Sequence, residues 1–217
     1  MAQKEIVKLE LLSIEVESSS DPVDRVRLET NHGTISCQYY KSADARAVVW
    51  IIGTGRATDS PGNGMYERLA ARLAGDNIAS LRLDYRKPGN LIDCVLDVLL
   101  GIGFLRKYGH QRVTLVGHSF GGSVAINASV ASPAVTAVAA LSSQLAGADD
   151  IAELAPRPVL LMHGSADEVR SEIGSRHLFE LAADPKELIL YEGCGHDYTE
   201  CSENVERDLL AWLHRVA

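Results

Sequence analysis

Short apolar runs alternate with amphipathic stretches along most of the chain. The run Ala47–Ile52 is apolar at every position, which is typical of a strand buried on both faces of a sheet. Later runs rich in β-branched residues indicate more strands, and the stretches between them carry apolar residues at helical spacing. This alternation predicts a mostly parallel sheet with helices on both faces. We expect strands over residues 47–52, 79–85, 112–117, 135–141, 158–162 and 187–191, and helices around 65–73, over 91–107, 121–130 and 173–183, and from an N-cap at Ser202 onward.

The first 45 residues follow a period of two instead. Polar and apolar residues alternate over 24–30, and Asn31-His32-Gly33 then predicts a turn into a second extended run, 34–40. The segment Ile6–Glu17 alternates in part as well. These segments predict antiparallel strands at one edge of the sheet. We therefore expect the chain, 1–217, to form a single α/β domain around a mixed sheet of about eight strands.

The composition is that of a folded globular protein. Hydrophobic residues make up 46% of the 217 positions and charged residues 23%, which suffices for a buried core. The net charge is −8 and no stretch concentrates lysine and arginine, which argues against binding of nucleic acid or anionic membranes. The longest run of apolar and glycine residues, Val98–Leu105, is far shorter than a membrane span. The first residues lack the apolar core of a signal peptide, so a cytoplasmic location is expected.

Four cysteines stand at positions 37, 94, 194 and 201. A chain of this length does not need disulfides to fold, and the cytoplasm keeps thiols reduced, so buried or inert thiols are expected. The closeness of Cys194, His196 and Cys201 raises the alternative of a zinc site. Their spacing matches none of the paired patterns usual for zinc ligands, and no metal is expected.

One serine stands in a motif with a defined structural context. Residues Gly117-His118-Ser119-Phe120-Gly121 read G-x-S-x-G, directly after a predicted strand and directly before a predicted helix. Glycines on both sides allow a sharp turn that lifts the serine hydroxyl out of the sheet. The turn also places the serine at a helix N-terminus, where the helix dipole favours a developing negative charge. On the pentapeptide alone, an ordinary glycine-rich turn stays open as the alternative.

A serine nucleophile needs a base, and the base needs an orienting carboxylate. His196 follows the strand 187–191, and Asp167 follows the strand 158–162. Both therefore leave the carboxyl ends of strands, the edge where open α/β sheets form their sites. The chain order Ser, Asp, His is also the order expected of such a triad on an open α/β sheet. The residues predict Ser119 as nucleophile, His196 as base and Asp167 as acid, with Asp197 a weaker rival because it adjoins the base.

These motifs resemble the α/β-hydrolase superfamily, and within it the small esterases and dienelactone-hydrolase-like proteins. The resemblance runs from about residue 24 to the C-terminus and includes, besides the serine motif, the segment LRLDYR at 81–86 and the spacing of His163 and Asp167. It implies the α/β-hydrolase fold and the same nucleophile, base and acid. It also implies that His163, Asp84 and Arg86 hold loops in place. His118 is expected to pack beside the nucleophile.

Two backbone N–H groups are expected to bind the oxyanion of the tetrahedral intermediate. One belongs to Phe120, the residue after the nucleophile. The other should come from the loop after the strand 47–52, where the family's histidine is absent and the sequence reads Ile-Gly-Thr-Gly. A backbone donor does not depend on its side chain, so Thr54 can serve, with Gly55 as the alternative.

The surroundings of the serine predict an open site. Only residues 142–157, with one short helix over 149–154, separate two of the predicted strands, which is too little for a cap domain. Arg56 and Gln144 are candidates for the pocket wall, and the glycine-rich loop 54–64 is expected to form part of it and to have some mobility.

These features predict a serine hydrolase that cleaves a small ester through an acyl-enzyme on Ser119 without a cofactor. Its expected partner is a small-molecule acyl substrate. A thioesterase, a peptidase or an acyltransferase could use the same triad, because fold and triad do not fix the leaving group. A hydrolase-fold protein that binds a ligand without turnover is the alternative from another class. Dehalogenase chemistry and cysteine-type dienelactone hydrolysis are disfavoured, because a serine stands where each needs another nucleophile.

Overall fold

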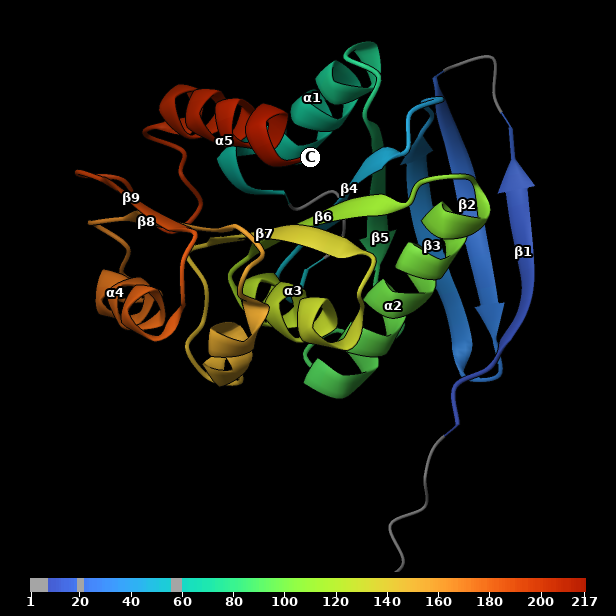
Figure 1. The fold of residues 1–217 in the computed structure, drawn as a ribbon, viewed down its shortest axis with the longest axis horizontal. Helices are drawn as coiled ribbons and strands as arrows, with labels where there is room; N and C mark the ends of the chain where they lie inside the picture. Colours follow the sequence, from blue (N-terminus) through green and yellow to red (C-terminus); the bar gives the residue numbers. More distant parts are fainter. Residues whose placement is uncertain (1–7, 19–21, 56–59) are drawn as a thin grey trace, which may run out of the picture.

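The computed structural model describes residues 8–18, 22–55 and 60–217. Its centre is one nine-stranded sheet in the order β1-β2-β3-β5-β4-β6-β7-β8-β9 (Figure 1), one strand more than the expected number of about eight. The strands are β1 (Leu11–Glu17), β2 (Val23–Thr30), β3 (Gly33–Tyr40), β4 (Arg46–Ile51), β5 (Ala79–Asp84), β6 (Arg112–His118), β7 (Val135–Leu141), β8 (Val159–Gly164) and β9 (Lys186–Tyr191). The helices are α1 (Pro61–Gly75), α2 (Leu91–Lys107), α3 (Phe120–Ala131), the 3₁₀ helix η1 (Asp149–Leu154), α4 (Glu172–Leu181) and α5 (Ser202–Val216).

The first three strands form an antiparallel extension at one edge. β1 pairs with β2, β2 with β3 and β3 with β5, all antiparallel. In β2 the buried residues alternate with exposed ones, as the two-residue period predicted. β1 is mostly exposed because only β2 adjoins it.

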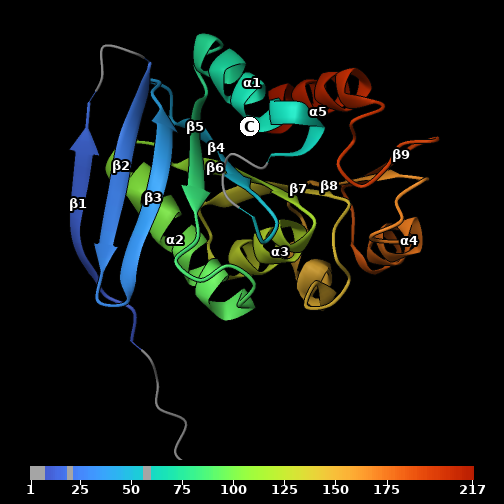
Figure 2. The same cartoon turned by 180° about the vertical axis from the view of Figure 1, so that it is seen from behind.

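The other strands run parallel and carry the helices on both faces. Helices α1 and α5 cover one face, and α2, α3, α4 and η1 cover the other (Figures 1 and 2). β4 lies between β5 and β6, and its positions 47–51 are all buried, as the apolar run predicted. The strand order reverses around β4, so the loops after β4 and β6 leave the carboxyl edge of the sheet at the reversal, the place where open α/β sheets bind ligands.

A buried ion pair fixes the loop between β5 and α2. Arg86 binds the Asp97 carboxylate through its side chain and through its backbone N–H, and both side chains are almost fully buried. Arg86 therefore holds this loop, the role expected of it, through Asp97 in α2. At the last helix the expected N-cap was off by one residue, because Cys201 occupies the N-cap position and Ser202 is the first helical residue.

The prediction that all cysteines are inert thiols is wrong for Cys194 and Cys201, which form a disulfide. The turn between β9 and α5 brings their Cα atoms to 5.9 Å, within the range that a disulfide spans. Cys37 and Cys94 are free and buried, as expected. Burial raises the pKa of the Cys94 thiol to about 12 and raises that of Cys37 as well, so neither is a thiolate at neutral pH.

Within the part of the chain that the structure describes, no helix has both the length and the apolar character that crossing a membrane requires.

Candidate active site

Ser119 stands on a strained turn between β6 and α3. Its φ and ψ are 56° and −120°, a conformation that a residue with a side chain rarely adopts. The chain passes so closely here that a Cβ on Gly117 would lie 2.1 Å from the Gly121 carbonyl oxygen. A Cβ on Gly121 would lie 2.3 Å from the carbonyl oxygen of Ile52. Both glycines of the motif are therefore required by the backbone, and the turn is tighter than an ordinary strand-to-helix connection.

The structure brings Ser119, His196 and Asp167 together from the ends of three strands. Ser119 Oγ lies 3.0 Å from His196 Nε2. His196 Nδ1 lies 2.7 Å from Asp167 Oδ2, so with the carboxylate ionised Nδ1 carries the proton and Nε2 is free to accept one. Asp197 takes no part in these hydrogen bonds, since its carboxylate is exposed and lies 3.8 Å from His118 Nε2. The arrangement can take a proton from the serine hydroxyl.

The Asp167 carboxylate receives hydrogen bonds on both oxygens. Oδ1 accepts the backbone N–H groups of Val169 and Arg170 at 2.8 and 2.7 Å, and Oδ2 lies 3.1 Å from His163 Nε2. Burial by itself raises the pKa of Asp167, but the Arg170 N–H, the His196 side chain and the Val169 N–H lower it below its ordinary value overall. Asp167 is therefore ionised at neutral pH and oriented by three donors, the N–H groups of Val169 and Arg170 and His196 Nδ1. His163 donates from Nε2 to the Arg170 carbonyl oxygen at 3.0 Å and bonds Ser175 Oγ through Nδ1 at 2.7 Å, so it holds the loop that carries Asp167, the role expected of it.

His118 contacts the backbone of the loop that carries His196. Its Nε2 donates to the His196 carbonyl oxygen at 3.0 Å, and the two ring centroids lie 4.8 Å apart. Burial lowers the pKa of His118 to about 4, so this imidazole is neutral at neutral pH. His118 therefore packs beside Ser119, as expected, and also holds the main chain of His196. The sequence carries no signal for this contact, because 78 positions separate the two residues.

Tyr198 is a second residue of the site that sequence reasoning missed. Its hydroxyl donates to the Met162 carbonyl oxygen and accepts from Ser142 Oγ, both at 2.9 Å. These bonds tie the His196 loop to the ends of β7 and β8. The sequence gives only a weak signal for this role, since a tyrosine two positions after a histidine is not typical of any particular structure or site.

The loop after β4 lies directly against the serine. A Cβ on Gly53 would lie 3.6 Å from Ser119 Cβ, and the Tyr85 hydroxyl donates to the Ile52 carbonyl oxygen at 3.1 Å. Thr54 and Gly55 follow on this loop and are exposed. Phe120 opens α3 directly after the serine. Both of the segments expected to supply oxyanion donors therefore border Ser119, whereas Arg56 lies outside the described residues.

Gln144 belongs to the wall of the site through its backbone. Its N–H donates to the Ser119 carbonyl oxygen at 3.1 Å, while its side-chain amide donates to Ser123 Oγ and to the Ala146 carbonyl oxygen. The side chain is therefore turned toward α3 and its own loop. A cavity of about 430 Å³ begins here, between the loop after β7 and the loop after β8. Its lining includes three exposed apolar side chains, Leu145, Val169 and Ile173.

One group of metal-binding residue types occurs at the site among the described residues. Ligand atoms of His118, His196 and Asp197 lie within 4.8 Å of one another. Hydrogen bonds to the His196 carbonyl, the Asp167 carboxylate and Ser119 already engage the two imidazoles, so we assign no metal to them. The sulfurs of Cys194 and Cys201 are bonded to each other and do not form the pair of thiolates that the zinc alternative requires.

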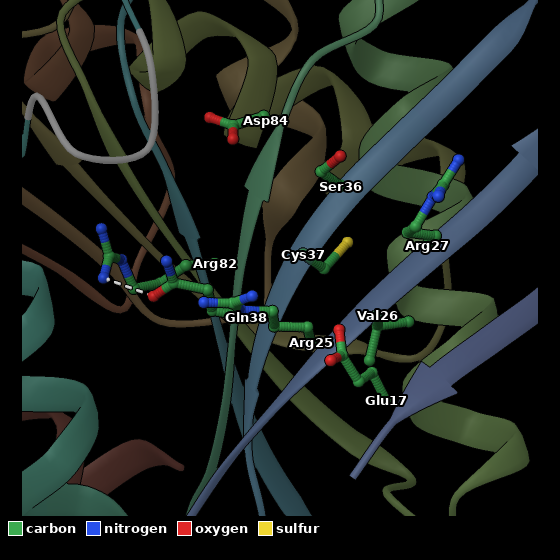
Figure 3. A pocket seen from close by; sticks show the side chains of 9 residues that line it. All are labelled: Glu17, Arg25, Val26, Arg27, Ser36, Cys37, Gln38, Arg82 and Asp84. Carbon is green, nitrogen blue, oxygen red and sulfur yellow. Dashed lines mark hydrogen bonds between the residues drawn. The ribbon is translucent and has the colours of Figure 1, made fainter. Parts of the chain in front are cut away.

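A polar cavity of about 340 Å³ lies elsewhere, on strands β1, β2, β3 and β5 (Figure 3). Two of its three arginines have acidic partners: Arg82 binds Glu67 and donates to Gln38, and Arg27 lies 2.8 Å from Glu29. Acidic side chains of Glu17 and Asp84 line it too. Because the charges offset one another, this cavity gives no reason to expect an anionic ligand.

Comparison with known proteins places the fold. No protein-family model and no curated protein matches the chain. Solved structures match it over nearly its whole length. The esterase domain of a Rhodothermus marinus protein is 19% identical, with a TM-score of 0.71 over 94% of this chain and 99% of that one.

Two further structures agree. A dienelactone hydrolase from Anabaena variabilis is 15% identical, with a TM-score of 0.74 over 94% of this chain and 97% of that one. An α/β serine hydrolase homologue from Coxiella burnetii is also 15% identical, with a TM-score of 0.74 over 90% of this chain and the whole of that one. The chain has the α/β-hydrolase fold in its small form, without a cap domain in the described residues.

Proposed function

We propose that this protein is a serine hydrolase that cleaves a small carboxylic ester through an acyl-enzyme on Ser119. The observation that carries the proposal is the unbroken line of hydrogen bonds from Ser119 Oγ through the His196 ring to Asp167. In the proposed reaction His196 Nε2 takes the hydroxyl proton as Oγ attacks the ester carbonyl. The protonated imidazole then gives this proton to the departing alcohol. Water, activated by the same nitrogen, finally releases the acid from Ser119.

The developing oxyanion is assigned to two backbone donors. The N–H of Phe120 lies at the N-terminus of α3, where the helix dipole adds to its effect. The second donor is Thr54, which follows the glycine that borders Ser119. Loss of one such donor costs about 10²- to 10³-fold in turnover in other serine hydrolases, so the pair is an important part of the proposal.

A small ester with an apolar acyl or alcohol group is the proposed substrate. The cavity beside the site presents Leu145, Val169 and Ile173, whose exposed fractions are 40, 63 and 70%. Such side chains stabilise an apolar group by removing it from water. The loops that form this cavity continue directly from the residues that bind the Ser119 carbonyl and Asp167. A peptide backbone, with its many polar groups, suits this lining less well.

The test is ester hydrolysis by the wild type and by Ser119→Ala. We expect wild-type turnover of p-nitrophenyl acetate and a loss of at least about 10⁴-fold in the variant, because removing the nucleophile of a triad has effects of this size. Ser36→Ala, an exposed serine on β3, serves as the matched control and should keep full activity. Unchanged turnover in Ser119→Ala would overturn the proposal.

The rival functions separate in the same assay. Thioester, aminopeptide and acyl-acceptor substrates distinguish a thioesterase, a peptidase and an acyltransferase from an esterase. A protein that only binds a ligand should not react with a fluorophosphonate probe, whereas the proposed nucleophile should be labelled at Ser119. The aligned His196 and Asp167 favour labelling over binding alone.

A further inference from the structure

We propose that the Cys194–Cys201 disulfide positions His196, so that reducing this bridge lowers the turnover of the site. The inference rests on the proposed function, because it takes His196 as the base. The bridge closes a loop with a sequence separation of seven, and His196 lies inside that loop, two residues after Cys194. The bridge therefore spans the residue on which the chemistry depends.

One end of the bridge is built into the turn that carries the acid. Cys194 is fully buried, and its carbonyl oxygen accepts the N–H of Ala166, the residue before Asp167, at 3.0 Å. The contact is close, since a Cβ on Gly164 would lie 2.1 Å from that same oxygen. Cys194 thus fixes the spacing between the acid loop and the base loop.

The hydrogen bonds between backbone groups inside the loop are long, and its other backbone anchors include the Glu200 carboxylate, which accepts the Gly195 N–H at 3.0 Å, and the Gly62 N–H, which donates to the Asp197 carbonyl oxygen at 2.6 Å. The turn bonds from Tyr198 N to the Gly195 oxygen and from Cys201 N to the Tyr198 oxygen are both 3.3 Å, at the long end for hydrogen bonds. Tyr198 has a φ of 58°, a left-handed conformation that a tyrosine adopts only when its surroundings impose it. Side-chain hydrogen bonds also hold the loop. The bridge adds a covalent link between the beginning of the loop, after β9, and its end at α5. Displacement of a catalytic group by about 1 Å can cost about 10²-fold in rate, so this link bears directly on turnover.

The bridge is also within reach of a reductant. Cys201 is partly exposed, and residues 199–204 line a surface cavity of about 270 Å³. A thiolate of a dithiol attacks the Cys201 sulfur, and Cys194 leaves as a thiolate that takes up a proton. The second thiol of the reductant then attacks the reductant sulfur that is bonded to Cys201. The reductant becomes a cyclic disulfide, and Cys201 is released as a thiol. Two electrons and two protons pass from the dithiol to the protein.

The experiment measures kcat and KM of the full chain with p-nitrophenyl acetate before and after treatment with dithiothreitol, and again after reoxidation. We expect reduction to lower kcat about tenfold with KM little changed, and reoxidation to restore it. A loss of base positioning moves kcat, whereas a merely structural loosening of the pocket would raise KM. A second readout is the downfield proton resonance of the His196 Nδ1–H bonded to Asp167, which should broaden on reduction.

The double variant Cys194→Ser/Cys201→Ser is the matched control. It should show the kcat of the reduced wild type and no response to dithiothreitol, although Cys37 and Cys94 remain as free thiols. Should this variant not fold, reduction of the wild type at a temperature where circular dichroism shows it folded gives the same comparison.

Two results would overturn the inference: four free thiols in the untreated protein, or equal kcat in its oxidised and reduced forms. Ser119→Ala distinguishes this failure from that of the proposed function. If Ser119→Ala is inactive and reduction has no effect, the nucleophile stands and only the role of the bridge is wrong. If Ser119→Ala is as active as the wild type, the proposed function itself is wrong.

Discussion

Three imidazoles lie within the site, and their hydrogen bonds separate their roles. His118 and His163 each donate from Nε2 to a backbone carbonyl, of His196 and of Arg170. Only His196 presents a ring nitrogen to the serine hydroxyl. The two supporting imidazoles are side chains with little exposure to water, whereas the His196 ring retains some exposure at the mouth of the site. The different roles of the three histidines therefore follow from the hydrogen-bond partner of each Nε2 atom.

We predict that His118 makes the stability of the fold depend on pH. Its pKa is about 4 in the folded protein, because burial disfavours the charged ring, against about 6.5 for an ordinary histidine. Between these values the unfolded chain binds a proton that the folded protein does not, so stability falls as the pH is lowered from 6.5 to 4. The slope for one such group is up to about 1.4 kcal/mol per pH unit.

The measurement is urea unfolding at several pH values between 4.5 and 7. His118→Gln should flatten the decline in free energy of unfolding over this range. His32→Gln, in the exposed turn before β3, should leave it unchanged. Equal slopes in His118→Gln and the wild type would show that His118 is not the group responsible.

At the scale of elements, the site is made by loops that follow the parallel strands. In the proposed reaction the loops after β4 and β6 supply the oxyanion region and the nucleophile, and those after β8 and β9 supply the acid and the base. The loop after β7 binds the Ser119 carbonyl and forms the apolar cavity with the loop after β8 and the start of α4. The loop after β8 therefore contributes both to the proposed chemistry, through Asp167, and to the cavity, through Val169, whereas Leu145 and Ile173 belong to the cavity alone.

We predict that Ile173 sets part of the preference for acyl chain length. Ile173→Ser should lower the ratio of kcat/KM for p-nitrophenyl butyrate over acetate, by about fourfold for each methylene that loses its apolar contact, since a buried methylene contributes about 0.8 kcal/mol. Leu12→Ser replaces a similarly exposed leucine on β1 and should keep the ratio of the wild type. A ratio that Ile173→Ser leaves unaltered would place the acyl group outside this cavity.

At the scale of the whole molecule, the sheet has two parts with different tasks. The parallel strands hold the site, while β1, β2 and β3 extend the sheet at the opposite edge from β9. β1 is the outermost strand and pairs only with β2. In Figure 2 it lies at the far side of the molecule from α4 and β9.

We predict that removing residues 1–18 leaves the chemistry in place. The truncated chain should hydrolyse p-nitrophenyl acetate with a kcat/KM within about twofold of the full chain, because distant changes act independently. Its melting temperature should be lower, because the core loses the side chains of Ile14 and Val16 that pack against it in the full chain. A folded truncated chain without activity would contradict the separation of the two parts.

Much of this arrangement is predictable from the sequence, and the remainder has identifiable causes. Apolar runs such as 47–52 and the period of two in 24–30 report strand burial directly, so the sheet and its antiparallel edge follow from them. The close approach of Gly117 and Gly121 also follows from their place around Ser119. These signals are local, and each depends on residues near one another in the chain.

Contacts between distant segments left no such signal. The bond from His118 to the His196 carbonyl and that from Tyr198 to Met162 depend on how the loop after β9 meets the ends of β6 and β8 in space. The disulfide was missed for another reason: spacing alone does not distinguish two reduced cysteines from two whose Cα atoms a turn has brought to bonding distance.

The short connection over residues 142–157 has a consequence for the fate of the acyl group. The segment between β7 and β8 forms only loops and the 3₁₀ helix η1, so among the described residues it places no domain over Ser119. With no such domain there, we expect bulk water to reach the proposed acyl-enzyme once the alcohol departs, while competing alcohols reach it only at their own dilute concentration. Partition of the intermediate should then favour the free acid over a new ester.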